Sequence, residues 1–559
     1  MRNILRHHII VPPWLSAMLV LGLWLTNCTP RYAAPSPASP VSGLPTGTGG
    51  QPWWNDTVFY QIFVRSFYDS DGDGSGDLKG ILSKLDYLND GDPAANDDLG
   101  VTGLWLMPIH PATSYHGYDV TDYYAIHPDY GSLDDFKLLL AEAHQRGMRV
   151  IIDLVLNHTS CQHPWFQSAQ DPASTYRDWY VWSQTEPVGS GWHPSDAGFY
   201  FGIFQECMPD LNYTNPQVEA EMKNVVRFWL EEVGVDGFRL DAAKHLIEQG
   251  SIQSHSPATH TWYEGFRSDY KAINPQALTV GEVWDSSVAV KAYLEGEELD
   301  LAFSFDLAKA WILSARLGKA EEAASLLKRE AGLFHPNQFA VFLTNHDQDR
   351  IMTLLADEMQ KGKIAASMLL TAPGVPFIYY GEEIGMLGKK PDEMIRTPMQ
   401  WSAQPNGGFT NGQPWEAVNP DFTTKNVAAQ SKETGSLLNH YRKLIHLRRQ
   451  YAALRIGGYL PVTASQPSIL AFLRHSSSPD ETLLVIINLA SEPVSDFSLS
   501  LPEGPLLGSY RIAPVLAEMK LDGFTENLPA TSTGGFGEYR PMTSLPAFST
   551  IILQLLPVE

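Results

Sequence analysis

Basic residues are scarce in this chain. It has 39 Lys and Arg against 63 Asp and Glu, which gives a net charge of −24. So acidic a protein is poorly suited to bind nucleic acid or an anionic membrane, and we expect neither as a partner. Only 18% of residues are charged, and the 44% hydrophobic and 11% aromatic fractions are typical of a soluble globular protein. Its 559 residues exceed one compact core and predict two to four domains.

Cysteine is also scarce, with three residues in the whole chain. Cys28 lies in the N-terminal segment described next, which leaves Cys161 and Cys207. In an oxidising compartment these two are able to pair, but the sequence does not give their distance. A disulfide and two separate thiols therefore both stay open.

Residues 1–28 have the pattern of an export signal. Two arginines precede an apolar run, 9–25, that two prolines interrupt, so the run is unsuited to span a membrane. Its end resembles a bacterial lipoprotein signal in which Cys28 carries lipid, although Asn27 differs from the small residue usual there. We expect an exported protein, extracellular, periplasmic or lipid-anchored at the cell surface, and lipidation of Cys28 stays open. Residues 29–52, rich in Pro, Ser, Gly and Thr, predict a flexible linker.

Short apolar runs alternate with amphipathic helical stretches through residues 53–455. Near-continuous apolar runs are typical of strands buried on both faces, and stripes such as 133–143 and 218–233 predict the helices between them. Eight such strands favour an α/β fold, a closed (β/α)8 TIM barrel with catalytic residues at the carboxyl ends of its strands. The runs are 58–63, 103–108, 150–155, 237–241, 278–282, 301–304, 339–343 and 377–380.

Two stretches depart from this rhythm. Residues 158–215 are rich in Trp, Tyr, Pro and Gly and are too long for an ordinary barrel loop. They predict a small inserted domain after the third strand, which divides the barrel into 53–157 and 216–455. Residues 456–559 contain alternating strands separated by turn residues and predict a C-terminal antiparallel β-sandwich.

Polar clusters follow four of the predicted strands. Arg239 stands two residues before Asp241, so in an extended segment both side chains point to the same side. A neighbouring guanidinium keeps a carboxylate ionised and oriented, as a nucleophile requires. Glu282 ends the fifth run beside two apolar residues, which favour a raised pKa and a retained proton. His158 follows the third run and Asp347 the seventh.

These four clusters, at 153–158, 237–245, 281–284 and 344–347, resemble in type and order the signature regions of the alpha-amylase superfamily, glycoside hydrolase family 13. The resemblance covers roughly residues 53–559. It implies a retaining glycosidase with Asp241 as nucleophile, Glu282 as general acid/base and Asp347 as the third carboxylate, which binds sugar hydroxyls. Retention requires one ionised and one protonated carboxyl group about 5–5.5 Å apart.

The resemblance also implies a set of substrate-binding residues. Arg239 holds Asp241 ionised, and Asp119 with Arg396 is expected to close the non-reducing end of the sugar pocket. The sugar at the cleavage point contacts Tyr118, His158 and His346, and the sugar on the leaving side contacts Lys244 and His245.

Carboxylates alternate with glycines from Asp69 to Asp77, a pattern able to wrap oxygen ligands around Ca²⁺. The pattern begins like an EF-hand loop, but Gly80 stands at the twelfth position, where Glu is required. It resembles instead the metal loop after the first barrel strand of the superfamily. A second calcium site at Asn157 stays open. We expect one Ca²⁺ held by the side chains of Asp69, Asp71, Asp73 and Asp77 and the carbonyl of Ser75.

Specificity motifs point two ways. Residues 208–212 resemble a form intermediate between oligo-1,6-glucosidases and neopullulanases, and 396–401 resembles the former group. Ala242 follows the nucleophile where α-1,6 specialists carry valine, which favours α-1,4 cleavage. Export also suits an enzyme that acts on external starch or maltooligosaccharides.

Three alternatives stay beside α-1,4 hydrolysis. One is an enzyme like oligo-1,6-glucosidase or neopullulanase, and another is a transglycosylating enzyme of the trehalose synthase type. A non-catalytic glucan-binding surface protein is the third, but the presence of all three carboxylates argues against it. Endo or exo action stays open, and we expect a monomer.

Overall fold

The computed structural model describes residues 43–476, 478, 481–517 and 521–558. The predicted export signal and residues 29–42 of the predicted linker lie outside these ranges. Residues 43–52 contact the barrel: the Pro45 carbonyl accepts a 2.9 Å hydrogen bond from Arg149, and Thr48 Oγ1 donates to Asp56 at 2.9 Å. Within the described residues, no helix combines the length and apolar character needed to cross a bilayer.

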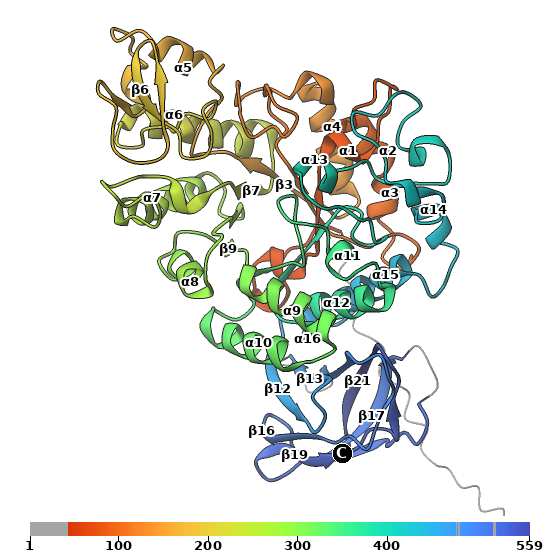
Figure 1. Cartoon of the computed structure of the whole chain (residues 1–559). Coiled ribbons are helices and arrows are strands. Elements are labelled where there is room, and N and C mark those ends of the chain that lie inside the picture. The colour runs from red at the N-terminus through yellow and green to blue at the C-terminus, as the bar shows by residue number, and fades with distance from the viewer. Residues whose placement is uncertain (1–42, 477, 479–480, 518–520, 559) are drawn as a thin grey trace, which may run out of the picture. The chain divides into compact units, whose positions relative to one another are not determined.

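Eight parallel strands form the barrel, as predicted (Figure 1). Their order is β10-β11-β1-β2-β3-β7-β8-β9, and a parallel bridge between Phe303 and Ala340 joins the two ends of this row. An aromatic layer fills the interior, where Phe59 stacks on Phe377 at 4.5 Å. The strands are β1 Phe59–Ile62, β2 Gly103–Leu106, β3 Arg149–Leu154, β7 Gly237–Leu240, β8 Leu278–Gly281, β9 Leu301–Ala302, β10 Ala340–Val341 and β11 Val375–Tyr379.

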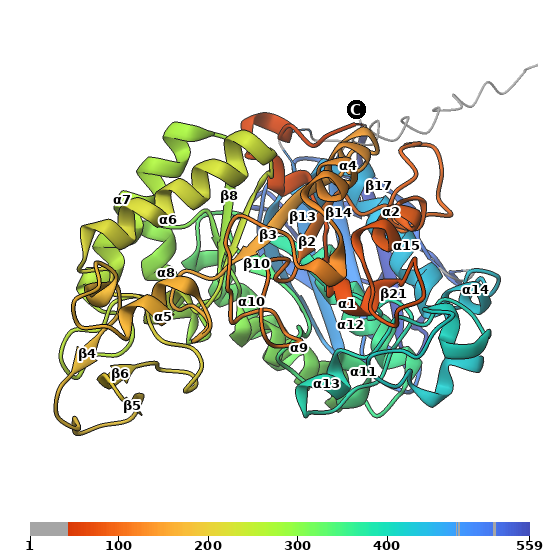
Figure 2. The same ribbon diagram turned by 90° about the horizontal axis from the view of Figure 1, so that it is seen from above.

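Helices surround these strands (Figure 2). The predicted stripe of α4 faces inward, since Phe136, Leu139, Leu140 and Ala143 are buried, and a capping box at Ser132 begins the helix. The longer helices are α4 Leu133–Gln145, α6 Pro216–Arg227, α7 Pro257–Ile273, α9 Phe305–Leu317, α10 Glu321–Leu333, α12 Met359–Thr371 and α15 Leu437–Gln450.

The predicted inserted segment contains α5 (Pro164–Ala169) and a small antiparallel sheet. The sheet has the order β4-β6-β5, with β4 Trp182–Ser183, β5 Trp192–Ser195 and β6 Gly198–Phe201. Cys161 and Cys207, at the two ends of this segment, are joined in a disulfide. The pairing that the sequence left open is therefore present.

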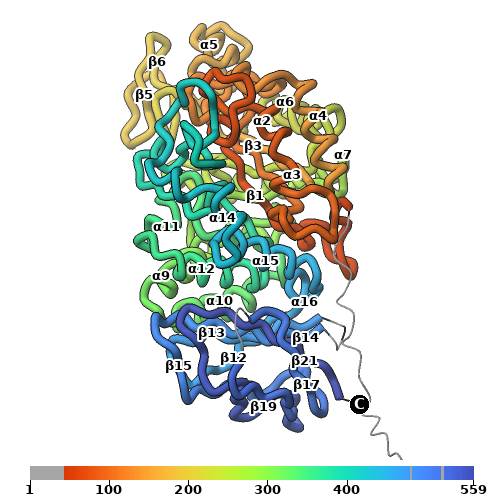
Figure 3. Tube along the Cα trace, turned by 90° about the vertical axis from the view of Figure 1, so that its right-hand side faces the viewer, coloured from red at the N-terminus to blue at the C-terminus, as the bar shows by residue number. Residues whose placement is uncertain are grey.

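The C-terminal strands form an antiparallel β domain, as predicted, with the order β18-β17-β21-β14-β13-β12-β16-β19 (Figure 3). Alternate residues, such as Leu484 and Ile486 of β14, enclose an apolar core separate from that of the barrel. The strands are β12 Gly458–Ala464, β13 Ile469–His475, β14 Thr482–Asn488, β16 Leu499–Glu503, β17 Ser509–Leu516, β18 Asn527–Pro529, β19 Gly534–Tyr539 and β21 Ser549–Val558, beside the pair β15 Val494–Ser495 and β20 Ser544–Leu545.

Arg474 of β13 is fully buried and links this domain to the barrel. It donates to the carbonyl of Thr371, the last residue of α12, at 2.9 Å, and to the carbonyl of Gly457 at 3.0 Å. Because a buried carbonyl without a donor carries its full desolvation cost, this side chain stabilises both chain segments.

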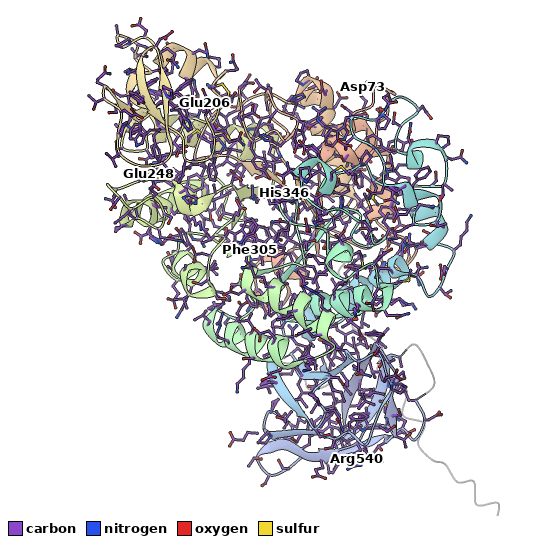
Figure 4. All side chains as sticks on the ribbon, in the orientation of Figure 1. Asp73, Glu206, Glu248, Phe305, His346 and Arg540 are labelled. Carbon is purple, nitrogen blue, oxygen red and sulfur yellow. A yellow bond between two sulfur atoms is a disulfide. The ribbon has the colours of Figure 1, made fainter. Side chains whose placement is uncertain are left out.

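Replacement Arg474→Met should therefore lower the free energy of unfolding by roughly 2–4 kcal/mol. Arg540→Met is the matched control, because Arg540 (labelled in Figure 4) is 57% exposed and its ion pair with Asp496 is 3.5 Å long. The control should change stability by less than about 0.5 kcal/mol. Urea denaturation followed by fluorescence measures both, and equal stabilities of the two variants would contradict the assignment.

Candidate active site

Asp241 and Glu282 directly follow the neighbouring strands β7 and β8, whose last residues, Leu240 and Gly281, are paired in register. Arg239 of β7 donates to Asp241 Oδ1 at 2.7 Å, and its other terminal nitrogen lies 2.9 Å from Glu282 Oε2. One guanidinium, only 1% exposed, thus holds both carboxyl groups. The two groups face the same place at the carboxyl ends of the strands.

Glu282 has the surroundings of a proton donor. Burial, opposed by Arg239 and reinforced by the charges of Asp241 and Asp347, raises the pKa of Glu282 to about 7. The amide of Ala242, in the left-handed region with φ of 48°, donates to Glu282 Oε2 at 3.1 Å. The side chain of Glu282 stays 12% exposed, so a substrate oxygen is able to reach it.

Asp347 lies in the loop that follows the seventh barrel strand, β10, beside His346 and Arg396. Its Oδ1 accepts from Arg396 at 2.9 Å, and its Oδ2 lies 3.1 Å from His346 Nε2. The Tyr118 ring stacks on His346 at 5.5 Å, and its hydroxyl lies 2.6 Å from His346 Nε2. Burial lowers the pKa of His346 well below its ordinary value, so this imidazole stays neutral at neutral pH. Figure 4 labels His346 among the central strands.

His158 follows β3, whereas Lys244 and His245 follow β7, the strand that also leads to Asp241. His158 is 2% exposed, and its Nε2 has no hydrogen-bond partner among the described residues. Such an orphaned buried nitrogen suits a ligand hydroxyl as partner. Lys244 Nζ donates to the Trp284 carbonyl at 2.7 Å, and His245 Nδ1 lies 2.8 Å from the Gln253 carbonyl.

We expect Asp119 and Arg396 to close the non-reducing end of the sugar pocket, and that role stays a prediction. Among the described residues Asp119 forms no ion pair. It accepts instead from the hydroxyls and backbone amides of Thr113 and Ser114, which satisfy its charge locally. Arg396 is committed to Asp347, to Asp392 at 3.1 Å and to the His346 carbonyl at 2.9 Å.

Sequence reasoning missed Tyr115 and Trp415 beside this arginine. The Arg396 guanidinium lies 5.8 Å from the Tyr115 ring, which stacks on Trp415 at 5.3 Å with an interplanar angle of 23°. Tyr115 stands three residues before Tyr118, but Trp415 comes from a distant loop without a motif. Only the folded chain brings the two rings together.

The loop after β1 brings part of the predicted metal set together. Asp69, Asp71 and Asp77 each offer a carboxylate oxygen within 4.8 Å of the others. Among the described residues, no Lys, Arg or His forms an ion pair with these three acids. Three clustered carboxylates without a basic partner fit a hard cation that takes oxygen ligands. Asp73, labelled in Figure 4, lies outside this group and accepts from the Ser75 amide at 2.7 Å.

A second set of buried oxygens surrounds Asn157. Asn157 Oδ1, Asp210 Oδ2 and Glu248 Oε1 are buried without hydrogen-bond partners among the described residues. Burial, reinforced by the charge of Glu248, raises the pKa of Asp210 well above its ordinary value. These three oxygens are candidate ligands for a second cation, and the sequence alone did not identify the partners of Asn157 in such a site.

A closed parallel barrel with two carboxyl groups held by one arginine, and a third on a nearby strand end, defines a glycoside hydrolase. Residues 61–457 match the model of the alpha amylase catalytic domain, and the chain belongs to the alpha-amylase family, glycoside hydrolase family 13.

Alpha-amylase 3 of Dictyoglomus thermophilum is 42% identical over 448 residues, covering 78% of this chain and 86% of that protein. The trehalose synthase/amylase TreS of Mycolicibacterium smegmatis is 33% identical over 522 residues, covering 80% and 86%. The crystal structure of the alpha-amylase from H. orenii superposes with a TM-score of 0.75 at 42% identity, covering 89% of this chain and 99% of that one.

The pKa of Glu282 predicts the alkaline limb of the activity profile. Glu282 must be protonated to donate, and a pKa raised to about 7 means that the proton is lost above that pH. We expect kcat/KM on maltotetraose to fall about tenfold per pH unit above this value. With α-maltosyl fluoride, whose leaving group needs little protonation, the fall should be smaller. An oligosaccharide profile that stays flat to about pH 9 would show that Glu282 is not the acid.

Proposed function

We propose that this enzyme hydrolyses α-1,4-glucosidic bonds of starch and maltooligosaccharides with retention of configuration. The observation that carries the proposal is the pair Asp241–Glu282 on one arginine, with the pKa of Glu282 raised to about 7. The two carboxyl groups on one arginine would supply the nucleophile and the proton donor that double displacement requires.

The reaction follows from these positions. Asp241 attacks the anomeric carbon while Glu282 gives its proton to the leaving oxygen, which forms a glycosyl ester on Asp241 and frees the leaving sugar. Glu282, now ionised, takes a proton from water, which attacks the ester and releases the sugar with its original configuration. Asp347, Arg396 and the neutral His346 would bind hydroxyls of the sugar attached to Asp241 and strengthen their hold as positive charge develops.

Bond specificity is supported by the sequence and by the similarity to known proteins. Ala242 directly follows the nucleophile, at a position where the α-1,6 specialists of the family tend to carry valine. The 42% identity to Alpha-amylase 3 also favours α-1,4 hydrolysis.

A second candidate is isomerisation or transglycosylation, since a trehalose synthase/amylase is 33% identical to this chain. Such an enzyme would pass the glycosyl group from Asp241 to a sugar hydroxyl rather than to water. The same carboxylates serve both reactions, so the fate of the glycosyl ester decides between them.

Residues 1–28 further support export of the enzyme, and the Cys161–Cys207 disulfide suits an oxidising compartment. Mass spectrometry of the mature N-terminus checks this proposal. An N-terminus at the original methionine would contradict it, and a lipid-modified Cys28 would add a membrane anchor.

A product profile over time on starch, pullulan, isomaltose, panose and maltose tests the bond specificity. We expect new reducing ends of α configuration from starch, little cleavage of isomaltose, and no trehalose from maltose. Replacement Asp241→Ala should lower kcat by at least about 10⁴-fold without loss of fold. Asp134→Ala, which removes an exposed carboxylate of α4, is the control and should keep full activity. Trehalose as the main product from maltose would favour isomerisation, and full activity of Asp241→Ala would remove the nucleophile.

We also propose that Asp69, Asp71 and Asp77, with Asp73 and the Ser75 carbonyl, hold Ca²⁺. The cation would relieve repulsion among the three clustered carboxylates and so stabilise the loop after β1. Calcium at one hundred times its Kd should raise the free energy of unfolding by about 2.7 kcal/mol over the chelated enzyme. In Asp69→Ala, calcium and EGTA should give equal stabilities by thermal denaturation, whereas Asp134→Ala should respond like the wild type. A wild type that calcium does not stabilise would contradict the site.

A further inference from the structure

Phe204 is an exposed aromatic side chain at the edge of the site. It belongs to none of the sequence motifs and has no part in the proposed reaction. It is 45% exposed, and its ring centroid lies 5.5 Å from His158 and 5.6 Å from His245. Both contacts are edge-on, so the ring stands between two imidazoles that come from different strand ends. An aromatic ring left half in solvent beside a glycosidase site offers a surface on which a sugar ring is able to pack.

The position of His245 shows on which side of the scissile bond this ring lies. Residues 242–245 run beside 282–285: the Ala243 amide donates to the Glu282 carbonyl at 3.1 Å, and Lys244 Nζ donates to the Trp284 carbonyl. Glu282 must stand next to the oxygen that leaves. The segment that packs on Glu282, and the ring that contacts its His245, therefore flank the leaving sugar.

A two-stranded ribbon carries Phe204 to this place. Residues 157–161 and 207–211 run antiparallel. The Leu211 amide donates to the Asn157 carbonyl at 2.9 Å, and the Cys161 amide donates to the Cys207 carbonyl at 3.1 Å. The Cys161–Cys207 disulfide joins the outer end of the ribbon, and Phe204 lies three residues beyond it.

Hydrogen bonds also hold the loop that bears the ring: the Gly202 amide donates to the Gly191 carbonyl at 2.7 Å, and the Ile203 amide donates to Asp210 Oδ1 at 3.2 Å. The neighbouring Gln205 and Glu206 are exposed, and the loop contains neither helix nor strand. Tyr200 donates a hydrogen bond of 2.6 Å to the Glu206 carbonyl (Glu206 is labelled in Figure 4). The disulfide adds a covalent restraint on the Cys207 side of Phe204.

We propose that Phe204 is the platform for the sugar on the leaving side of the scissile bond, and that the Cys161–Cys207 disulfide positions it there. Phe204 thereby sets the affinity for oligosaccharide leaving groups and for sugar acceptors, while the carboxylates perform the chemistry. This inference rests on the proposed glycosidase function and extends it to the leaving-side specificity.

Substrates with and without a sugar leaving group separate this role from a general structural one. Phe204→Ala should lower kcat/KM on maltotetraose about tenfold, since it removes a ring that packs on the leaving sugar. Hydrolysis of α-maltosyl fluoride, which places no sugar there, should change by less than about twofold. Phe204→Tyr should restore most of the loss, and Leu507→Ala, which truncates an 82% exposed side chain of the C-terminal domain, should match the wild type. Equal losses on both substrates, or none on maltotetraose, would overturn the proposal.

The role of the disulfide is tested by the ratio of kcat/KM on maltotetraose to kcat/KM on α-maltosyl fluoride. The double variant Cys161→Ser/Cys207→Ser should lose activity selectively on maltotetraose. The wild type treated with dithiothreitol should do the same, because the two thiols of dithiothreitol are oxidised as the disulfide is reduced. Dithiothreitol should not affect the double variant further. Retained fluoride hydrolysis shows that the double variant is folded, and a wild-type ratio in it would refute the positioning role. If the wild type cleaves α-1,6 bonds or isomerises maltose instead, the proposed bond specificity fails, and the same comparison with that substrate still decides the role of Phe204.

Discussion

The site depends on one buried arginine. Arg239 contacts Asp153 at 2.6 Å, Asp241 at 2.7 Å and Glu282 at 2.9 Å, and is itself only 1% exposed. A single positive charge is thus shared by three carboxyl groups. Two anions already exceed that charge, so a third anion in the same buried place is unfavourable. Burial raises the pKa of both Glu282 and Asp153 to about 7 despite the arginine, and of these two only Glu282 is exposed enough to meet a substrate.

Strand register makes this sharing possible. Asp153 and Arg239 are paired in register on β3 and β7, and Trp105 of β2 donates its indole N–H to Asp153 at 3.0 Å. Asp153 is fully buried and held from two strands, so it fixes the arginine rather than meeting a substrate. Arg239 in turn orients Asp241 and Glu282, which remain 12% exposed. Exposure thus increases from the barrel interior towards the reacting groups, and the hydrogen bonds of each layer position the next.

Much of this arrangement could be predicted from the sequence, because the pattern that carries it is local. Eight apolar runs predicted eight strands. A residue that directly follows a barrel strand has a position that the topology fixes, and Asp241 and Glu282 are such residues. The hydrogen bonds of Asp119 with Thr113 and Ser114, its near neighbours in sequence, could not be predicted from a motif. The contacts of Phe204 and Trp415 depend on the path of long loops, which no periodic pattern sets.

The inserted segment supplies what strand ends alone lack. The barrel interior is filled by aromatic side chains such as Phe59, Trp105 and Phe377, so substrate has access only at the rim, where the strand ends present charged and polar groups. Charged groups provide acid, base and electrostatic stabilisation, but a sugar also presents apolar faces, which bind best to aromatic rings. A ring on an exposed loop is poorly fixed by packing, since the surface that binds sugar must stay free. A covalent tie beside the ring resolves this conflict, because the disulfide restrains the loop without covering the face of Phe204.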